Sequence, residues 1–338
     1  MRLLMVFLGL FILSTQTWAQ YPIFKVPGLK PAEKIPALNA DPNSITVSGL
    51  SSGAFMAVQL GVAYSKQIKG VAAIAGGIYN CAEGNVDTAT NVCMKNPANI
   101  KPETYMDLAK SSFKKSLIDD PANLTQQRVF ILNGTEDKTV APIAGHKLEE
   151  FYKSFGANPR TEYSLKMGHA FPSNKGKNEC SVSQFPWLNN CKYDGAKAIL
   201  ETLYGPLNQV SKKQTTSGEL LTIDQTEFAK ADAKMLDAGN LYIPSVCRDK
   251  KTQCRIHVAL HGCLQGPNIV QKAFIEDAGY NEWADKNKII VLYPAVGMGS
   301  GNPNGCWDWF GYTGENYAVK SAPQMTAIMN MVQRLTEN

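Results

Sequence analysis

The stretch SITVSGLSSGAFMAVQLGVAYSK, residues 44–66, decides the fold of this chain. Its first residues, 44–47, favour a strand, and residues 54–66 predict a helix. Between the two, Ser51 has a glycine two residues before it and another two residues after it. This G-x-S-x-G pattern is typical of a sharp turn from strand to helix that exposes a nucleophilic serine. Neither rival nucleophile, Ser48 or Ser52, has glycine at both of these positions.

Two later loops supply an acid and a base for this serine. The first follows a predicted strand and carries Asp137, with Glu136 as the rival carboxylate. The second follows another predicted strand and carries His169, and a glycine just before it lets the loop bring the imidazole back toward the serine. A serine hydroxyl is a weak nucleophile until such a base takes its proton. The predicted triad is Ser51, Asp137 and His169, in the chain order of the α/β-hydrolase fold.

The second half of the predicted site lies far along the chain. An oxyanion hole needs two N–H groups that face the developing charge, and we expect them from Ser52 and from Cys263 in the segment His261-Gly262-Cys263. In an ordinary α/β-hydrolase the loop with the second donor precedes the nucleophile in sequence, whereas here it follows. The sequence therefore predicts a circularly permuted fold in which Ser52 and Cys263 meet. An ordinary strand-end turn that contains a disulfide is the structural alternative for this segment.

Strand and helix patterns alternate through most of the chain, which predicts an α/β fold with a mainly parallel sheet and helices on both faces. His257 falls inside one strand and is expected in the core, while His146 falls on a charged helix and is expected in solvent. Residues 213–249 suit antiparallel strands at the sheet edge. The predicted strands are 44–47, 70–74, 129–132, 161–165, 256–260 and 289–292, with 228–235 and 241–246 as edge candidates. The predicted helices are 54–66, 143–155, 195–204, 269–286 and 322–336.

The first residues predict export. Arg2 precedes an apolar run at 3–13, and small residues at Thr17 and Ala19 precede a cut before Gln20. We therefore expect a signal peptide at 1–19 and a single catalytic domain at 20–338. The apolar run is short for a membrane anchor. The formal net charge is +5 without any basic block, which does not suggest binding to nucleic acid.

The chain has eight cysteines, an even number that favours disulfides in an exported protein. Eight cysteines allow 105 pairings in principle. A zinc site fits poorly, because no C-x-x-C occurs and only four histidines are present. Proximity in sequence suggests the pairs Cys81–Cys93, Cys180–Cys191 and Cys247–Cys254, which leaves Cys263–Cys306.

Taken together, several segments resemble the extracellular poly(3-hydroxybutyrate) depolymerases and related secreted esterases. These segments are VSGLSSGAFMAVQLGVAYS, LNGTEDKTVAP, MGHAFPS, ALHGCLQ and NPNGCWDW. Ordinary members have the LHGC and GCWxW segments before GLSxG, so this chain looks like the permuted, single-domain type. The resemblance implies the triad and oxyanion donors named above, and it implies that Asn304, Trp307 and Trp309 contact substrate. From the residues alone, Trp307 and Trp309 could equally be core aromatics.

The resulting hypothesis is a secreted serine esterase that acts on poly(3-hydroxybutyrate) or its oligomers as a monomer, with no metal or organic cofactor. Export could end outside the cell or in the periplasm. Another substrate class stays open, namely feruloyl, acetyl-sugar or small soluble esters. A secreted binding protein on a non-catalytic hydrolase fold is the minor alternative, although no member of the triad is missing from the sequence.

Overall fold

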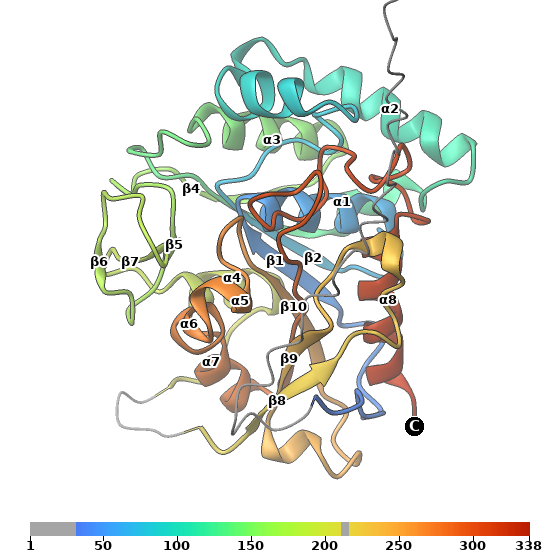
Figure 1. Cartoon of the computed structure of the whole chain (residues 1–338), viewed down its shortest axis with the longest axis vertical. Helices are drawn as coiled ribbons and strands as arrows, with labels where there is room; N and C mark the ends of the chain where they lie inside the picture. Colours follow the sequence, from blue (N-terminus) through green and yellow to red (C-terminus); the bar gives the residue numbers. More distant parts are fainter. Residues whose placement is uncertain (1–31, 211–215) are drawn as a thin grey trace, which may run out of the picture. The chain divides into compact units, whose positions relative to one another are not determined.

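The central β-sheet has eight strands in the order β4-β3-β2-β1-β10-β11-β9-β8 (Figure 1). The computed structural model describes residues 32–210 and 216–338, and Ala32–Asn338 form one compact unit. The predicted signal peptide at 1–19 lies outside the described residues. The strands are β1 Thr46–Leu50, β2 Gly70–Ile74, β3 Arg128–Leu132, β4 Arg160–Glu162, β8 Glu219–Asp224, β9 Ala238–Ile243, β10 Arg255–Leu260 and β11 Ile289–Tyr293.

The sheet is mainly parallel, as predicted. All neighbouring strands from β4 to β11 run parallel, whereas β9 and β8 are antiparallel and form one edge. The parallel strands are apolar because helices bury both of their faces. Along β2, for example, Val71 and Ala73 belong to one buried cluster, while Ala72 and Ile74 belong to the other.

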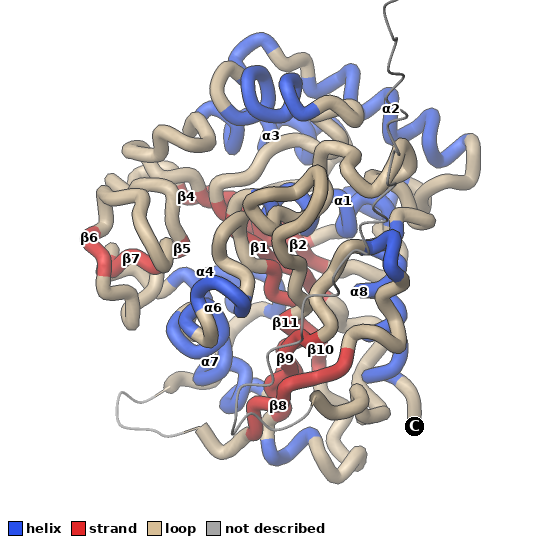
Figure 2. The backbone as a smooth tube through the Cα atoms, viewed as in Figure 1, coloured by secondary structure: helices blue, strands red, loops and turns tan. Residues whose placement is uncertain are grey.

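Helices cover both faces, and the strands lie between them (Figure 2). The first apolar cluster joins the sheet to α1, α2, α3 and α8, and the second joins it to α4, α5, α6 and α7. The helices are α1 Ser52–Ala63, α2 Pro102–Lys114, α3 Ile143–Ser154, α4 Gly195–Tyr204, α5 Pro267–Val270, α6 Ala273–Asp277, α7 Tyr280–Asn287 and α8 Pro323–Thr336. A π-helix spans Thr88–Met94, and short 3-10 helices span Pro97–Asn99, Pro121–Gln126, Ala231–Ala233 and Ser245–Cys247.

A second, small sheet lies beside the main one. It has the strand order β5-β7-β6, with β5 at Phe171–Pro172, β6 at Asn178–Glu179 and β7 at Leu188–Asn190. The disulfide Cys180–Cys191 closes the same segment. This sheet follows directly on the loop that carries His169, so it is placed to hold that loop.

The strand order confirms the circular permutation. If the strands are counted from β8, the first four are β8, β9, β10 and β11. Helix α8 follows them, and β1 is then the fifth strand. In that count the strand ending at Leu260 is third, which is the strand that precedes the oxyanion loop in α/β-hydrolases. The N–H groups of Leu38 and Ala40 donate to the carbonyl of Leu335, at 3.3 and 3.0 Å. The end of α8 therefore lies against the segment that enters β1, where an ordinary chain would run straight on.

Most predicted elements are present, but several differ. The strand predicted at 161–165 is the shorter β4, and the helix at 269–286 is broken into α5, α6 and α7, because Gln271 and Gly279 have φ angles of 54° and 93°. The strand predicted at 228–235 is wrong. The N–H groups of Phe228 and Ala229 donate to the carbonyl of Gln225 and form turns, and Lys234 is left-handed, with φ 50°. The polar sequence of α2 gave no signal strong enough to predict that helix.

A buried chain of hydrogen bonds joins β1 to β10. Tyr204 donates to the Ile256 carbonyl at 2.6 Å and accepts from Thr46 at 2.8 Å. Thr46 therefore accepts from Nδ1–H of His257 at 2.7 Å, and Nε2 of His257 accepts from Ser48 at 2.7 Å. Ser48 in turn accepts from Tyr280 at 2.7 Å. Every group is satisfied when His257 is neutral, and burial lowers the pKa of His257 to about 3. The expectation of a core histidine is confirmed.

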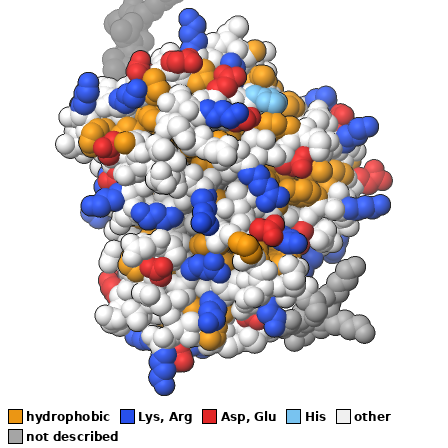
Figure 3. Space-filling view, turned by 180° about the vertical axis from the view of Figure 1, so that it is seen from behind, with side chains coloured by type: hydrophobic (Ala, Val, Ile, Leu, Met, Phe, Trp, Pro, Cys, Tyr) orange, Lys and Arg blue, Asp and Glu red, His pale blue; other side chains and the backbone are white. Residues whose placement is uncertain are grey.

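The surface carries mixed charge. On the face shown in Figure 3, basic side chains lie among acidic and apolar ones. Among the described residues, no helix is both long and apolar enough to cross a bilayer.

The buried histidine makes the protein sensitive to acid. Because the pKa of His257 is about 3 in the folded protein and near 6.5 when unfolded, the unfolded state binds more protons between these values. The free energy of unfolding should therefore fall by a few kcal/mol as the pH drops through this window. The variant H257Q should be less stable at pH 7 but should show a flatter pH dependence. Urea unfolding at several pH values measures both effects. The control S154A, which removes no titratable group, should keep the wild-type slope, and an unchanged slope in H257Q would refute the assignment.

Candidate active site

Ser51 occupies a strained turn between β1 and α1. Its backbone angles are φ 55° and ψ −122°, a region that L-residues rarely adopt. A Cβ on Gly49 would lie 2.2 Å from the carbonyl carbon and oxygen of Gly53, so the turn requires glycine there. Ser51 is 8 % exposed. This is the local geometry predicted for a nucleophile elbow.

Asp137 and His169 are brought together as predicted. Oδ2 of Asp137 lies 2.7 Å from Nδ1 of His169, and both side chains are buried. Oδ1 of Asp137 accepts from the N–H groups of Thr139 and Val140, at 2.8 and 2.9 Å. With the carboxylate held in this way, Nδ1 carries the imidazole proton and Nε2 is left with a free lone pair. The rival Glu136 is exposed and pairs loosely with Lys138.

Ser51 and the Asp137–His169 pair lie at the same edge of the sheet, because β1 and β3 are both parallel to β2 and all three end there. Among the hydrogen bonds of the described residues, none joins Ser51 Oγ to His169. Hydrogen bonds between a catalytic nucleophile and its base are often long in the absence of substrate, so this geometry is compatible with His169 acting as the base for Ser51.

The small sheet holds the His169 loop. The N–H of His169 donates to Ser183 Oγ at 2.7 Å, and the N–H of Gly168 donates to the Cys180 carbonyl at 2.9 Å. A Cβ on Gly168 would lie 2.4 Å from the Val182 carbonyl oxygen, so the two segments are in close contact. The role of Ser183 could not be predicted from the sequence, because its contact with His169 depends on how the disulfide-closed loop 180–191 folds back.

The elbow and the second oxyanion segment are neighbours. Gly49 pairs with Leu260 across β1 and β10. A Cβ on Gly53 would lie 2.4 Å from the carbonyl oxygen of His261, so glycine is needed for this approach. Within the described residues, neither the N–H of Ser52 nor that of Cys263 donates a hydrogen bond. The segment His261-Gly262-Cys263 therefore lies against the elbow that carries Ser51 and Ser52.

The loop that contains Asn304, Trp307 and Trp309 packs against the elbow. The N–H of Trp307 donates to Ser52 Oγ at 3.3 Å. Asn304 is exposed, and its carbonyl accepts from Leu264 at 2.7 Å. The ring of Trp307 is fully buried, and the ring of Trp309 stacks on Phe55 at 3.9 Å. Both tryptophans therefore occupy core positions next to the site, and only Asn304 presents an open side chain.

Buried polar groups hold this loop in shape. Asp308 is 1 % exposed, and its carboxylate accepts from the N–H groups of Gly311 and Thr313 at 2.7 and 2.8 Å. Gln59 of α1 donates to the Asp308 carbonyl at 3.0 Å. This connection ties the loop to the helix that begins at the elbow.

All eight cysteines form disulfides, in the pairs suggested by proximity: Cys81–Cys93, Cys180–Cys191, Cys247–Cys254 and Cys263–Cys306. The last pair fixes the oxyanion segment to the tryptophan loop. Of the remaining histidines, His146 is half-buried and packs on Tyr163, with ring centres 4.1 Å apart, which differs from the solvated position expected. His261 is buried, and burial lowers its pKa to about 4.

The sheet order, the elbow and the site beside it define the chain as an α/β-hydrolase of the serine hydrolase class. No protein-family model matches it. Two solved structures of PHB depolymerases match with a TM-score of 0.84 and 38% identity, over 90% of this chain and 98% of theirs. One is from Penicillium funiculosum, and the other is a serine-to-alanine variant in complex with an R3HB trimer.

Sequence relatives agree with the structures. A polyhydroxybutyrate depolymerase of Talaromyces funiculosus is 39% identical over 323 residues, which cover 90% of this chain and 93% of the relative. A poly(3-hydroxybutyrate) depolymerase of Delftia acidovorans is 38% identical over 330 residues, which cover 96% of this chain and 66% of that protein. The chain belongs to the polyhydroxybutyrate depolymerase family.

The contact at Gly53 can be tested directly. In G53A the added methyl group would overlap the Leu260 and His261 carbonyl oxygens, so the end of β10 must move. We expect a loss of roughly 1–3 kcal/mol in the free energy of unfolding together with reduced esterase activity. Urea unfolding and a chromogenic ester assay measure these effects. The control G299A has nothing within 4 Å of the added methyl and should match the wild type. If G53A also matched it, the close approach would be wrong.

Proposed function

We propose that this protein is a secreted serine esterase that hydrolyses poly(3-hydroxybutyrate) or its oligomers through Ser51, His169 and Asp137. The observation that carries the proposal is the buried Asp137–His169 pair, 2.7 Å apart, at the sheet edge where the strained Ser51 lies. The family match supports the substrate, since one matching structure is a depolymerase in complex with an R3HB trimer.

The arrangement suits acyl transfer. Nε2 of His169 takes the proton of Ser51, and Ser51 Oγ attacks the ester carbonyl carbon. The N–H groups of Ser52 and Cys263 stabilise the oxyanion. His169 then protonates the departing alcohol, and water hydrolyses the acyl-enzyme with the same base. Asp137 keeps the imidazole in the required tautomer and stabilises its charged form. Apart from the water that is consumed, these steps use side chains and backbone groups of this chain.

Substrate contacts are proposed for Asn304, Trp307 and Trp309. Asn304 is open to solvent beside the oxyanion segment. Trp307 is fully buried and its indole N–H has no acceptor among the described residues, while Trp309 packs on Phe55 behind the elbow. The proposed substrate contacts of the two tryptophans therefore rest on the family resemblance.

The variant S51A tests the reaction. We expect loss of turnover on polymer granules, followed by turbidity, and on a soluble chromogenic ester, with an unchanged far-UV spectrum. The control S154A, at the far end of α3, should retain wild-type rates. Residual turnover in S51A would remove Ser51 from the mechanism. Granule clearing with release of dimers or trimers supports the polyester substrate, whereas faster hydrolysis of feruloyl or acetyl-sugar esters would favour the alternative class.

We also propose that residues 1–19 are removed on export and that 20–338 act as a single monomeric domain. The four disulfides support passage through an oxidising compartment. Mass spectrometry of protein collected outside the cytoplasm should give a chain that begins at Gln20. A chain that retains residues 1–19 would contradict cleavage. Fractionation separates extracellular from periplasmic export, and light scattering on the same sample tests the monomeric state.

A further inference from the structure

Gln265 lies in the ALHGCLQ segment, but neither the triad nor the oxyanion donors account for it. This residue is buried, with 1 % of its surface exposed. Oε1 accepts from the N–H of Gly262 at 2.9 Å, and Nε2 donates to the carbonyl of Pro186 at 3.1 Å and less closely to that of Trp187, at 3.4 Å. Because a backbone N–H can only donate and a carbonyl can only accept, this orientation of the amide is the only one that satisfies all three contacts.

One end of the amide fixes the peptide that carries an oxyanion donor. The N–H of Gly262 is held by Gln265, and the carbonyl of Gly262 accepts from Nδ1 of His261 at 2.8 Å. Nε2 of His261 accepts from the N–H of Val296 at 3.2 Å, so Nδ1 must carry the proton. In a trans peptide the next N–H points away from this carbonyl. The direction of the Cys263 N–H is therefore set from both sides of Gly262.

The other end of the amide donates hydrogen bonds to the segment that holds the loop of the catalytic base. Pro186 and Trp187 belong to the same disulfide-closed segment as Ser183, which accepts from the N–H of His169. The carbonyl of Trp187 also accepts from the N–H of Phe171, two residues beyond His169, at 2.9 Å. Gln265 thus bonds directly to Gly262 of the oxyanion segment and to the disulfide-closed segment that holds the His169 loop.

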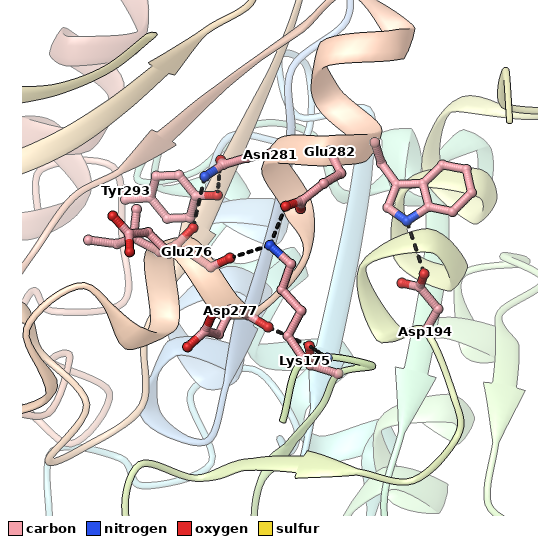
Figure 4. A network of polar contacts seen from close by, with 10 residues as sticks. Lys175, Asp194, Glu276, Asp277, Asn281, Glu282 and Tyr293 are labelled. Atoms are coloured by element: carbon pink, nitrogen blue, oxygen red, sulfur yellow. Dashed lines mark hydrogen bonds and ion pairs between the residues drawn. The ribbon is translucent and has the colours of Figure 1, made fainter. Parts of the chain in front are cut away.

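The chain on both sides of the disulfide-closed segment, residues 180–191, is anchored as well. Nζ of Lys175 donates to the Glu276 carbonyl at 2.9 Å and pairs with the carboxylate of Glu282 (Figure 4). Asp194 accepts from the indole N–H of Trp283 at 3.0 Å. These contacts attach the residues that flank the 180–191 segment to α6 and α7, so both ends of the segment that Gln265 contacts are held in place.

We propose that Gln265 is a positioning residue that fixes the direction of the Cys263 N–H relative to the imidazole of His169. The proposal rests on the proposed function, because it assigns Gln265 a role in forming the oxyanion hole. It predicts that losing the amide N–H donors lowers the rate of the chemical step more than it weakens substrate binding.

The variants Q265E and Q265M test this role with a soluble chromogenic ester. Glutamate keeps the size but, when ionised, places charge against two carbonyls, and methionine keeps the size without charge. Since loss of one oxyanion donor costs about 10²–10³ in kcat, we expect kcat to fall about 10–100-fold in both variants while KM stays within about 3-fold. At lower pH the neutral carboxyl of Q265E can donate again, so its kcat relative to wild type should rise, whereas that of Q265M should not.

A matched control is Q127E. Gln127 is also buried and donates to two carbonyls, those of Gly61 and Ile68, each at 3.0 Å, but it lies before β3 at the opposite edge of the sheet. Q127E should unfold more easily but keep the wild-type kcat of the folded enzyme. Equal losses of kcat in Q127E and Q265E, or an effect of Q265E and Q265M on KM alone, would overturn the proposal.

A double-mutant cycle with S183A tests the link to the base loop. If Gln265 acts through the segment that carries Ser183, the losses of kcat in Q265M and S183A should be less than additive, whereas additive losses would place the effect of Gln265 elsewhere. Failure of the proposed function gives a different result, since the wild type would then lack esterase activity altogether.

Discussion

The parallel pairing of β1 with β10 is the contact on which the site depends. Thr46 and His257 are 211 residues apart in sequence, yet they pair directly across these strands. Both strands end at the same edge, so the elbow and the oxyanion segment leave the sheet side by side. Gly53 permits the last step of this approach, because a side chain there would meet the His261 carbonyl. The site is thus assembled by backbone geometry, and side chains then refine it.

The two halves of the sheet are joined without any disulfide between them. Two disulfides lie within the half that starts at β1, and the other two lie within the half that starts at β8. The links across the boundary are strand pairing, the buried His257 chain and single contacts such as Gln265 to Pro186. Disulfides therefore stiffen each half, while non-covalent contacts decide how accurately the serine, the base and the oxyanion donors align. A buried, fully satisfied polar chain suits this task because a slip in register would leave its groups unpaired.

Much of this arrangement could be predicted from local sequence signals. The elbow glycines, the four disulfides and the permuted strand order follow from spacing and motif order, and helix α4 has the predicted bounds. One failure occurs where short-range hydrogen bonds override the local pattern. Residues 228–235 read as an extended, partly polar segment, but the N–H groups of Phe228 and Ala229 donate to the Gln225 carbonyl and form turns instead. The roles of Ser183 and Gln265 could not be seen, because each depends on a partner brought near by a disulfide loop whose path the sequence does not specify.

The permutation left the chemistry in place because it altered only the opposite edge of the sheet. The segment entering β1 meets the end of α8 at the amino end of β1. The new connection from α4 to β8 starts at the same edge, since Tyr204 bonds to the Ile256 carbonyl near the start of β10, and the N–H of Asn208 donates to Asn287 just before β11. Ligands of α/β folds bind beyond the carboxyl ends of the strands. Chain ends can therefore be joined and reopened at the amino edge without moving Ser51, His169 or Cys263 relative to one another.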